Sequence, residues 1–211
     1  MIYDISRTIS TRIAVWPGDS PFQFEHNLEL GKGDSINLTT ITLSPHTGSH
    51  ADAPYHYEAN GLHPHQLPLN AFLGPATVVQ TTKTDGPLYP EDFAHYHLEN
   101  VERLLIHSHV SDLPDDAWPA EFPYLSIELI DWLAERNVVL IGLDSPSVDA
   151  FDSTELPCHH ELYRRNIVNL EILNLKDVPD GDYELIALPL KMDHVCGAPV
   201  RAILRTLPTD R

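Results

Sequence analysis

The segment from residue 44 to residue 56 constrains the chain more than any other stretch. It is interrupted by Gly48 and by two prolines, and it carries four residues of metal-binding type, His46, His50, Asp52 and His56. Because proline fixes φ and removes a backbone donor, we predict neither a regular helix nor a central strand here, but a shaped loop. Imidazole and carboxylate groups are the usual ligands of first-row metals, and a glycine lets the backbone turn so that neighbouring side chains converge. The segment therefore predicts a metal centre.

The alternative for this segment is a surface loop that happens to be rich in histidine. The chain has 13 histidines among 211 residues, and several of them form alternating pairs at 63 and 65, 95 and 97, and 107 and 109. No carboxylate separates the members of those pairs. We therefore interpret the pairs as ordinary polar residues and keep the metal hypothesis for residues 46–56, where both ligand types occur together.

The composition indicates a single globular domain that covers residues 1–211. Hydrophobic residues make up 42% of the chain and charged residues 21%, which is ordinary for a folded protein of this length and excludes a disordered one. No apolar run approaches the roughly 20 residues that span a bilayer, and the N-terminus lacks the basic and apolar regions of a signal peptide. We expect a cytoplasmic protein that has no membrane partner.

The charge balance argues against nucleic acid as a partner. The chain has 13 Lys and Arg against 31 Asp and Glu, a formal net charge of −18, so most of its surface would repel a phosphate backbone. Its two cysteines, Cys158 and Cys196, are too few for a secreted disulfide framework. We expect both to be small core residues.

Hydrophobic periodicity predicts a domain in which strands outnumber helices. We expect strands at residues 2–5, 35–43, 75–81, 104–106, 138–143, 167–173, 185–190 and 200–204. The strongest helix pattern begins after Ser126 and ends before Asn137, and further helices are expected within 86–97 and 155–165. This order favours an α/β fold, or a borderline α+β fold, with a mixed sheet and few helices.

Two residues outside the histidine segment also suggest a site. Glu171 lies inside the apolar run 167–173, where a buried carboxylate is costly unless it is neutralised. A metal would neutralise it, whereas the alternative is an edge strand from which Glu171 points outward. Trp16 lies in the predicted turn 15–21 and is either a core aromatic residue that closes a loop or a stacking surface for an aromatic ligand.

The histidine segment resembles the His-x-Gly-Thr-His-x-Asp-x-Pro-x-His signature of the cyclase-like metal hydrolases, with Ser49 in place of threonine. The similarity continues through residues 15–19, 140–147, 183–190 and 199–202, so it spans nearly the whole chain. The stretches around Trp16 and Tyr183 favour the bacterial kynurenine formamidase branch of that superfamily. The resemblance implies the single-domain, swivelling β/β/α fold of these hydrolases and a homodimer.

The resemblance also implies two zinc ions in each subunit, with manganese or another divalent metal as the alternative. The first ion would be bound by His46, His50 and Asp52, and the second by Asp52, His159 and Glu171. Asp52 and Glu171 would bridge the two ions. His160 is the alternative to His159, which the spacing to Glu171 in the family favours.

The activity implied by the resemblance is the hydrolysis of N-formyl-L-kynurenine, an aromatic formamide, to L-kynurenine and formate in tryptophan degradation. A metal would lower the pKa of water from about 15.7 towards 7 and stabilise the oxygen charge that develops on the formyl group. His56 would donate and accept the proton, because an imidazole titrates near neutrality. Trp16 would contact the aromatic ring of the substrate.

Other functions remain open at this point. One is a cyclase-like hydrolase for another small amide or lactam, similar to the isatin hydrolases; another is a non-catalytic domain with a structural metal. Residues 191–198 differ from the small, nonpolar stretch expected from the family, and Asp193, His194 and Cys196 are additional candidate ligands there. An open metal position beside His56 would indicate catalysis, since structural zinc sites are closed by four protein ligands.

Overall fold

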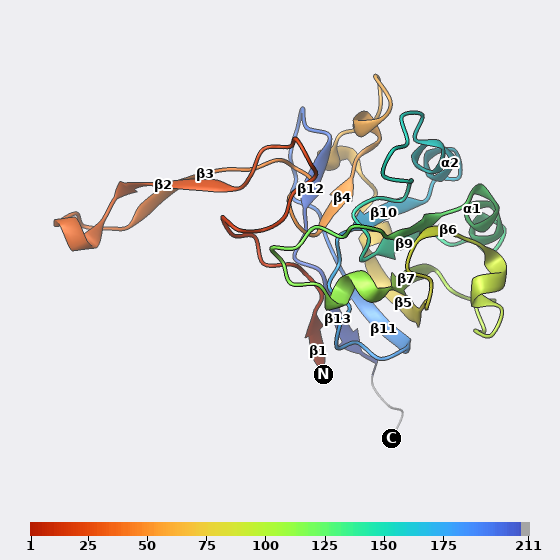
Figure 1. The fold of residues 1–211 in the computed structure, drawn as a ribbon. Helices are drawn as coiled ribbons and strands as arrows, with labels where there is room; N and C mark the ends of the chain where they lie inside the picture. The colour runs from red at the N-terminus through yellow and green to blue at the C-terminus, as the bar shows by residue number, and fades with distance from the viewer. Residues whose placement is uncertain (208–211) are drawn as a thin grey trace.

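The computed structural model describes residues 1–207, and a nine-stranded mixed sheet forms its centre (Figure 1). The order of the strands is β1-β13-β11-β5-β7-β9-β10-β4-β12. Neighbours from β5 to β10 run parallel, and the strands outside them pair in antiparallel fashion. In chain order the strands are β1 Ile2–Asp4, β4 His50–Asp52, β5 Leu73–Gln80, β7 Arg103–His107, β9 Leu140–Leu143, β10 Val168–Glu171, β11 Gly181–Ile186, β12 Gly197–Pro199 and β13 Ile203–Thr206.

The remaining elements lie around this sheet. Two smaller sheets pair β2 Gln23–Leu28 with β3 Leu38–Thr42, and β6 Gly86–Leu88 with β8 Pro123–Leu125. The α-helices of the described residues are α1 Ile127–Ala134 and α2 Pro157–Arg164, and neither they nor any other described helix is long and apolar enough to cross a bilayer. The 3₁₀ helices are Leu30–Lys32, Pro54–His56, Pro64–Gln66, Leu69–Phe72, Pro90–Phe93 and His109–Asp112.

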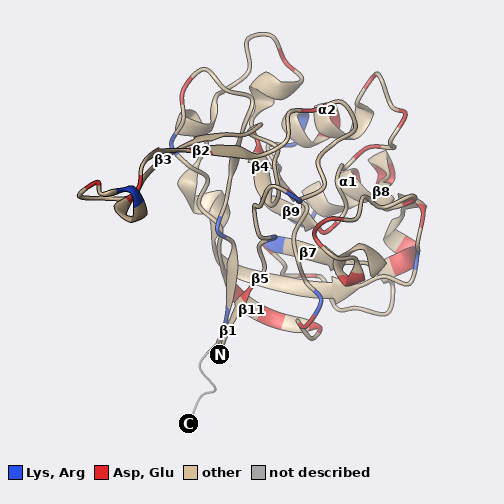
Figure 2. Ribbon diagram, turned by 60° about the vertical axis from the view of Figure 1, so that its left-hand side comes forward, with Lys and Arg blue, Asp and Glu red and all other residues tan. Residues whose placement is uncertain are grey.

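Buried apolar residues lie on both faces of the central strands and form two clusters. Consecutive residues of a strand point to opposite faces, so Val78 joins one apolar cluster and Val79 joins the other. The helices α1 and α2 pack on the second cluster. Strand β9 is buried throughout, as the continuous apolar run predicted for a parallel strand with both faces covered. Acidic residues are scattered over the surrounding helices, loops and strands, while basic residues are fewer (Figure 2).

The mixed sheet and the principal helix are confirmed. Ser126 caps α1, and its hydroxyl accepts a hydrogen bond from the backbone N–H of Leu129 at 3.0 Å. The prediction of a helix within 86–97 is wrong, because the chain forms the short strand β6 and a single 3₁₀ turn there. Gly86 has φ of 82°, outside the right-handed helical region, and residues 86–88 pair with β8 instead.

The prediction that the whole histidine segment is a loop is also wrong. Its residues His50–Asp52 form β4, which lies inside the sheet between β10 and β12. Ala51 aligns with Leu170 on one side and with Ala198 on the other. The prolines of the segment, Pro45 and Pro54, lie outside these three residues, so the hydrogen-bond ladder of the strand is intact.

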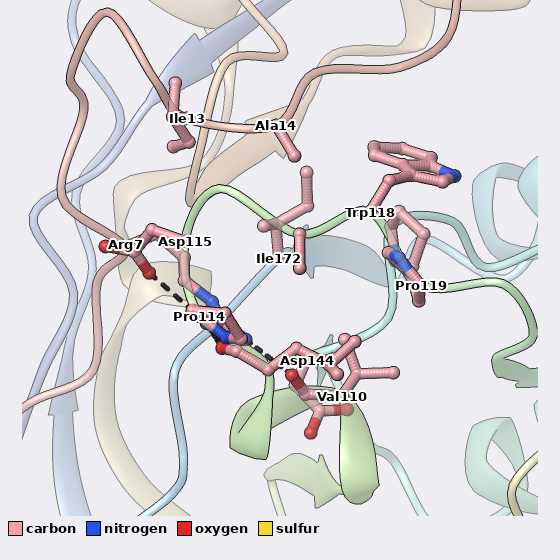
Figure 3. Close-up of a pocket in the computed structure, with 13 residues that line it drawn as sticks. Arg7, Ile13, Ala14, Val110, Pro114, Asp115, Trp118, Pro119, Asp144 and Ile172 are labelled. Carbon is pink, nitrogen blue, oxygen red and sulfur yellow. Dashed lines mark hydrogen bonds and ion pairs between the residues drawn. The ribbon is translucent and has the colours of Figure 1, made fainter.

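Asp144, at the end of β9, is a buried anchor between segments. Its carboxylate accepts hydrogen bonds from the backbone N–H and the hydroxyl of both Ser108 and Ser111, at 2.7 to 3.0 Å. Nearby, the Arg7 guanidinium donates to the carbonyl of Val110 at 2.7 Å (Figure 3). These bonds fix the turn after β7 against the loop that follows β9, and that loop leads towards the metal centre described below.

We expect Asp144→Ala to destabilise the fold. The substitution leaves four buried donors without an acceptor, so the free energy of unfolding should fall by roughly 3 kcal/mol. Urea denaturation measures this change. Asp116→Ala, at an exposed position, is the matched control and should alter stability by about 0.5 kcal/mol or less. Equal stability of the two variants would contradict a structural role for Asp144.

Candidate metal centre

Strand pairing assembles most of the centre. His50 and Asp52 are two residues apart on β4, so both side chains lie on the same face of the sheet. The antiparallel register between β4 and β10 places Glu171 opposite His50. The fourth member, His159, comes from α2, where it is buried. Glu171 is 4% exposed on an interior strand, which excludes the alternative that it points outward from an edge.

The side chains form two groups that share Asp52. The ligand atoms within each group lie within 4.8 Å of one another, and the groups are His46, His50 and Asp52, and Asp52, His159 and Glu171. Asp52 Oδ1 lies 3.0 Å from His46 Nδ1 and 3.3 Å from His50 Nε2. The other oxygen, Oδ2, lies 3.2 Å from His159 Nε2. The carboxylate thus presents one oxygen to each group.

Glu171 stands between the two groups. One of its carboxylate oxygens lies 3.6 Å from His50 Nε2, and the other lies 3.6 Å from His159 Nε2. The structure therefore brings together the five residues that the family resemblance assigns to the two ions. His160 is excluded from the group, because its side chain is 42% exposed and contacts Glu58 instead.

Hydrogen bonds fix which nitrogen of each ring faces the centre. His50 Nδ1 lies 2.9 Å from the carbonyl oxygen of Gly48, which can only accept, so Nδ1 carries a proton and Nε2 is the nitrogen that faces the centre. In the same way, His159 Nδ1 donates to Asp149 Oδ2 at 2.6 Å. With Nδ1 of each ring turned to these outer partners, both Nε2 atoms face the Asp52 carboxylate.

Unpaired buried atoms show that these residues fit a cation. His50 Nε2 and Asp52 Oδ1 are both buried without a hydrogen-bond partner, although they lie only 3.3 Å apart. Each such atom costs roughly 1 to 3 kcal/mol. A divalent metal would satisfy both at once, and imidazole nitrogens with carboxylate oxygens are a donor set suited to zinc or a related ion.

The electrostatics of these residues agree with this fit. Burial by itself would lower the pKa of His46, but the neighbouring Asp52 and Cys196 raise it to about 10. Burial likewise opposes the charge on His159, yet Asp149, Asp52 and Glu171 hold its pKa well above the usual value. The negative potential that favours these protons would equally favour a cation.

Two residues that support the ligands were not identified from the sequence. The Asn169 side chain donates to Asp52 Oδ2 at 2.8 Å and to Glu171 Oε1 at 3.1 Å. Its spacing of two from Glu171 on a strand was an available indication, since the two side chains share a face. Asp149, which orients His159, offered no local indication because its loop meets α2 only in the folded chain.

A cavity of about 620 Å³ opens over the centre, which is enough for a small organic ligand. Trp16 forms part of its wall, stacked on Phe151 at a centroid distance of 5.1 Å and edge-on to Trp118 at 5.5 Å. His56 lies in the 3₁₀ turn after β4, is exposed, and lines the same cavity. Its ring centroid is 4.2 Å from that of His46.

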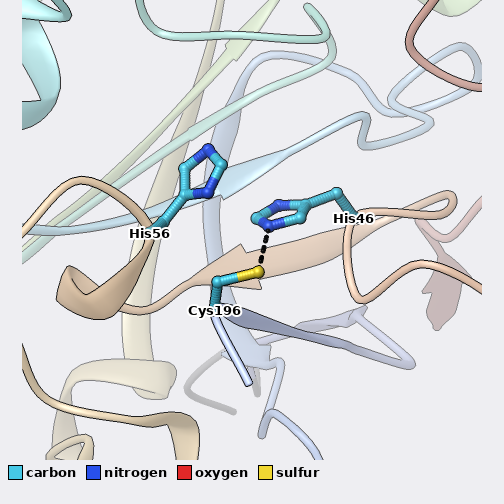
Figure 4. Close-up of side chains that lie close together, drawn as sticks. All are labelled: His46, His56 and Cys196. Atoms are coloured by element: carbon cyan, nitrogen blue, oxygen red, sulfur yellow. Dashed lines mark hydrogen bonds between the residues drawn. The ribbon is translucent and has the colours of Figure 1, made fainter. Parts of the chain in front are cut away.

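The prediction for the cysteines is correct for Cys158 and wrong for Cys196. Cys158 is buried, and its thiol contacts the carbonyl of Leu125. Cys196 is half-buried and lines the cavity, with Sγ 3.1 Å from His46 Nε2 (Figure 4). Hydrogen bonds with His46 and His56 lower the pKa of the Cys196 thiol to about 6.

The other two candidate ligands of residues 191–198 lie elsewhere. Asp193 and His194 are exposed and form a separate group with His63. None of the three lines the cavity over the metal centre. Of the three candidate ligands in this stretch, only Cys196 lines the cavity.

We expect Asp149→Asn to weaken metal binding. The amide accepts a weaker hydrogen bond from His159 Nδ1 than the carboxylate does, so the ring is held less firmly, and the loss of such an outer partner typically costs about 10- to 100-fold in affinity. Competition with a chromophoric zinc chelator measures the change. Asp152→Asn, three residues away and exposed, should bind zinc like the unaltered protein. Equal affinities for the two variants would argue against the proposed orientation of His159.

Comparison with known proteins agrees with this geometry. Residues 3–150 match the family described as putative cyclase. The kynurenine formamidase of Salinibacter ruber is 44% identical over 98% of both chains, and that of Bacillus cytotoxicus is 40% identical over 97% of both chains.

A solved structure described as a potential metal-dependent hydrolase with cyclase activity superposes with a TM-score of 0.84 at 26% identity, covering 99% of each chain. Isatin hydrolase A of Labrenzia aggregata superposes with a TM-score of 0.81 at 25% identity, covering 98% of this chain and 94% of its own. This chain belongs to the cyclase family.

Proposed function

We propose that this chain is a metal-dependent kynurenine formamidase, which hydrolyses N-formyl-L-kynurenine to L-kynurenine and formate. The names and full-length similarity of its relatives support the substrate. The observation that carries the proposal is the position of the centre: the Asp52 carboxylate and its histidine partners lie beneath a cavity whose wall also presents His56 and Trp16. A metal centre that opens into a ligand-sized cavity suits catalysis better than a structural role.

We further propose that two divalent cations, most simply zinc, occupy the centre. His46, His50 and Asp52 would hold one, and Asp52, His159 and Glu171 would hold the other. When bound, such cations would lower the pKa of water towards neutrality and stabilise negative charge on a carbonyl oxygen. Asn169 and Asp149 would keep the ligands oriented, because their hydrogen bonds already hold Asp52, Glu171 and His159 in place.

The chain's own residues can carry the rest of the reaction. In the hydrolysis, water adds to the formyl carbon, the carbon–nitrogen bond breaks, and the departing aromatic amine gains a proton. We assign this proton transfer to His56, since its imidazole is exposed to the cavity beside the metal-binding group. Trp16 would bind the aromatic ring of the substrate, because it already forms an aromatic wall with Phe151 and Trp118.

A second candidate is the opening of a cyclic amide. Isatin hydrolase A shares the fold of this chain at 25% identity, and a lactam presents the same carbonyl–nitrogen bond to the centre. The presence of Cys196 in the wall of the cavity is a local difference that can alter the choice of substrate.

Formate release from N-formyl-L-kynurenine tests the proposal. We expect activity that is lost on chelation and restored by zinc, and a decrease in kcat of about 10²- to 10⁴-fold in His56→Ala, because a general acid–base typically contributes that much. His97→Ala, at an exposed position outside the cavity, should keep full activity. A metal-loaded protein that opens isatin but leaves the formamide intact would replace the first candidate with the second, and one that cleaves neither would refute both.

We also propose that the chain forms a homodimer through the hairpin β2–β3. The hairpin projects from the body of the molecule (Figure 1), and all residues of β3 are exposed. Phe24 and Ile41 face each other across the two strands and are 49% and 57% exposed. An isolated two-stranded hairpin is only marginally stable in water, and exposed apolar patches commonly mark interfaces. A second copy of the chain would cover this surface.

Sedimentation velocity tests the dimer. The unaltered protein should sediment as two copies, and the double variant Phe24→Asp with Ile41→Asp should sediment as one, because charges replace the apolar pair of the hairpin. Leu69→Asp, which alters an apolar residue that is 61% exposed outside the hairpin, should leave the dimer intact. A single copy for the unaltered protein across the micromolar range would contradict the proposal.

A further inference from the structure

We propose that Cys196, His46 and His56 form a distinct site for a thiophilic divalent cation at the wall of the cavity. Their ligand atoms lie within 4.8 Å of one another, and Cys196 Sγ is 3.1 Å from His46 Nε2. The three side chains converge from separate segments, with His46 and His56 on either side of β4 and Cys196 just before β12 (Figure 4). This group differs from the Asp52 groups in composition, position and expected metal preference.

The donor chemistry defines the ligand class. One sulfur and two imidazole nitrogens are a set that known zinc sites use, and soft sulfur favours thiophilic ions over magnesium, calcium or manganese. The site contains no carboxylate, whereas both Asp52 groups contain at least one. We therefore expect cadmium, or zinc supplied in excess, to bind here.

The sheet holds Cys196 in place beside His46. Strand β12 pairs with β4, and Gly197 lies opposite Asp52 in that register. The carbonyl of Cys196 accepts a hydrogen bond from the backbone N–H of Ala53 at 2.9 Å. A Cβ atom at Gly197 would lie 2.9 Å from His46 Cε1, so only glycine lets the backbone approach the ring this closely. The position of the thiol therefore does not depend on a flexible loop.

His46 cannot serve both sites at once as a neutral ring. Its Nδ1 faces Asp52 at 3.0 Å and its Nε2 faces Cys196 at 3.1 Å, but a neutral imidazole has only one lone pair to donate. A cation bound to Cys196 would withdraw His46 from the Asp52 centre and would also occupy His56. Inhibition by the thiophilic cation follows from this competition, and this part of the inference rests on the proposed function.

The second cysteine provides an internal control. The chain contains two cysteines, and Cys158 is 4% exposed and lies outside the cavity. Any sulfur-to-metal signal can therefore be assigned by substituting each cysteine in turn.

The test is a cadmium chloride titration of the zinc-loaded protein, followed by the ultraviolet sulfur-to-cadmium charge-transfer absorption. We expect the band in the unaltered protein and in Cys158→Ser, and its loss in Cys196→Ser. His56→Ala keeps the thiol but loses one ligand of the cation. The loss of a residue that only supports a ligand already costs about tenfold or more in affinity, so the affinity for cadmium should fall at least that much. A missing band in the unaltered protein, a band that persists in Cys196→Ser, or an unchanged affinity in His56→Ala would overturn the site. If the unaltered protein shows no band and Cys196→Ser binds zinc more weakly, Cys196 acts only as a hydrogen-bond partner of His46.

Formate release in the same titration tests the competition separately. Cadmium should inhibit the unaltered protein and Cys158→Ser at lower concentrations than it inhibits Cys196→Ser, relative to the cadmium-free activity of each. Equal inhibition of all three would overturn the competition for His46. If no variant cleaves the formamide but the absorption band depends on Cys196, the cation site stands and the proposed function fails.

Discussion

The structure depends on keeping one buried carboxylate ionised. Asp52 is 3% exposed, and burying an unpaired charge would cost more than a small domain can tolerate. Burial acts to raise the pKa of this carboxyl, but His159, His46 and His50 hold it well below its usual value. Asn169 adds a hydrogen bond to the oxygen that faces His159. The surrounding residues thus make the site a preorganised receptor for positive charge.

The sheet provides the precision that this arrangement requires. Ligands on β4 and β10 are positioned by backbone ladders on both sides of each strand, and not by mobile loops. A period of two places His50 with Asp52, and Asn169 with Glu171, on matching faces. The residues that we propose to act on the substrate, His56 and Trp16, lie instead on connecting segments, where variation alters the cavity without disturbing the centre.

The position of Cys196 shows how a short stretch can add chemistry to such a framework. Strand β12 pairs with β4 and brings its first residue, Gly197, against His46. The ladder thereby presents the side chain that precedes Gly197 to His46. In this chain that side chain is a thiol.

The sequence by itself determined the candidate metal-binding segment and the mixed sheet, and it singled out Glu171, because residue type, spacing and apolar runs are local properties. It misjudged β4 as a loop, since the position of a three-residue strand depends on its neighbours and not on its own pattern. Only the tertiary structure decided that Glu171 is buried, that His159 faces the centre and His160 does not, and that Asp149, Asn169 and Cys196 contact the candidate ligands. His159 and Asp52 are separated by 107 residues, and Cys196 and His46 by 150. Local patterns show which face of an element is buried, but which groups meet across that face is fixed by packing.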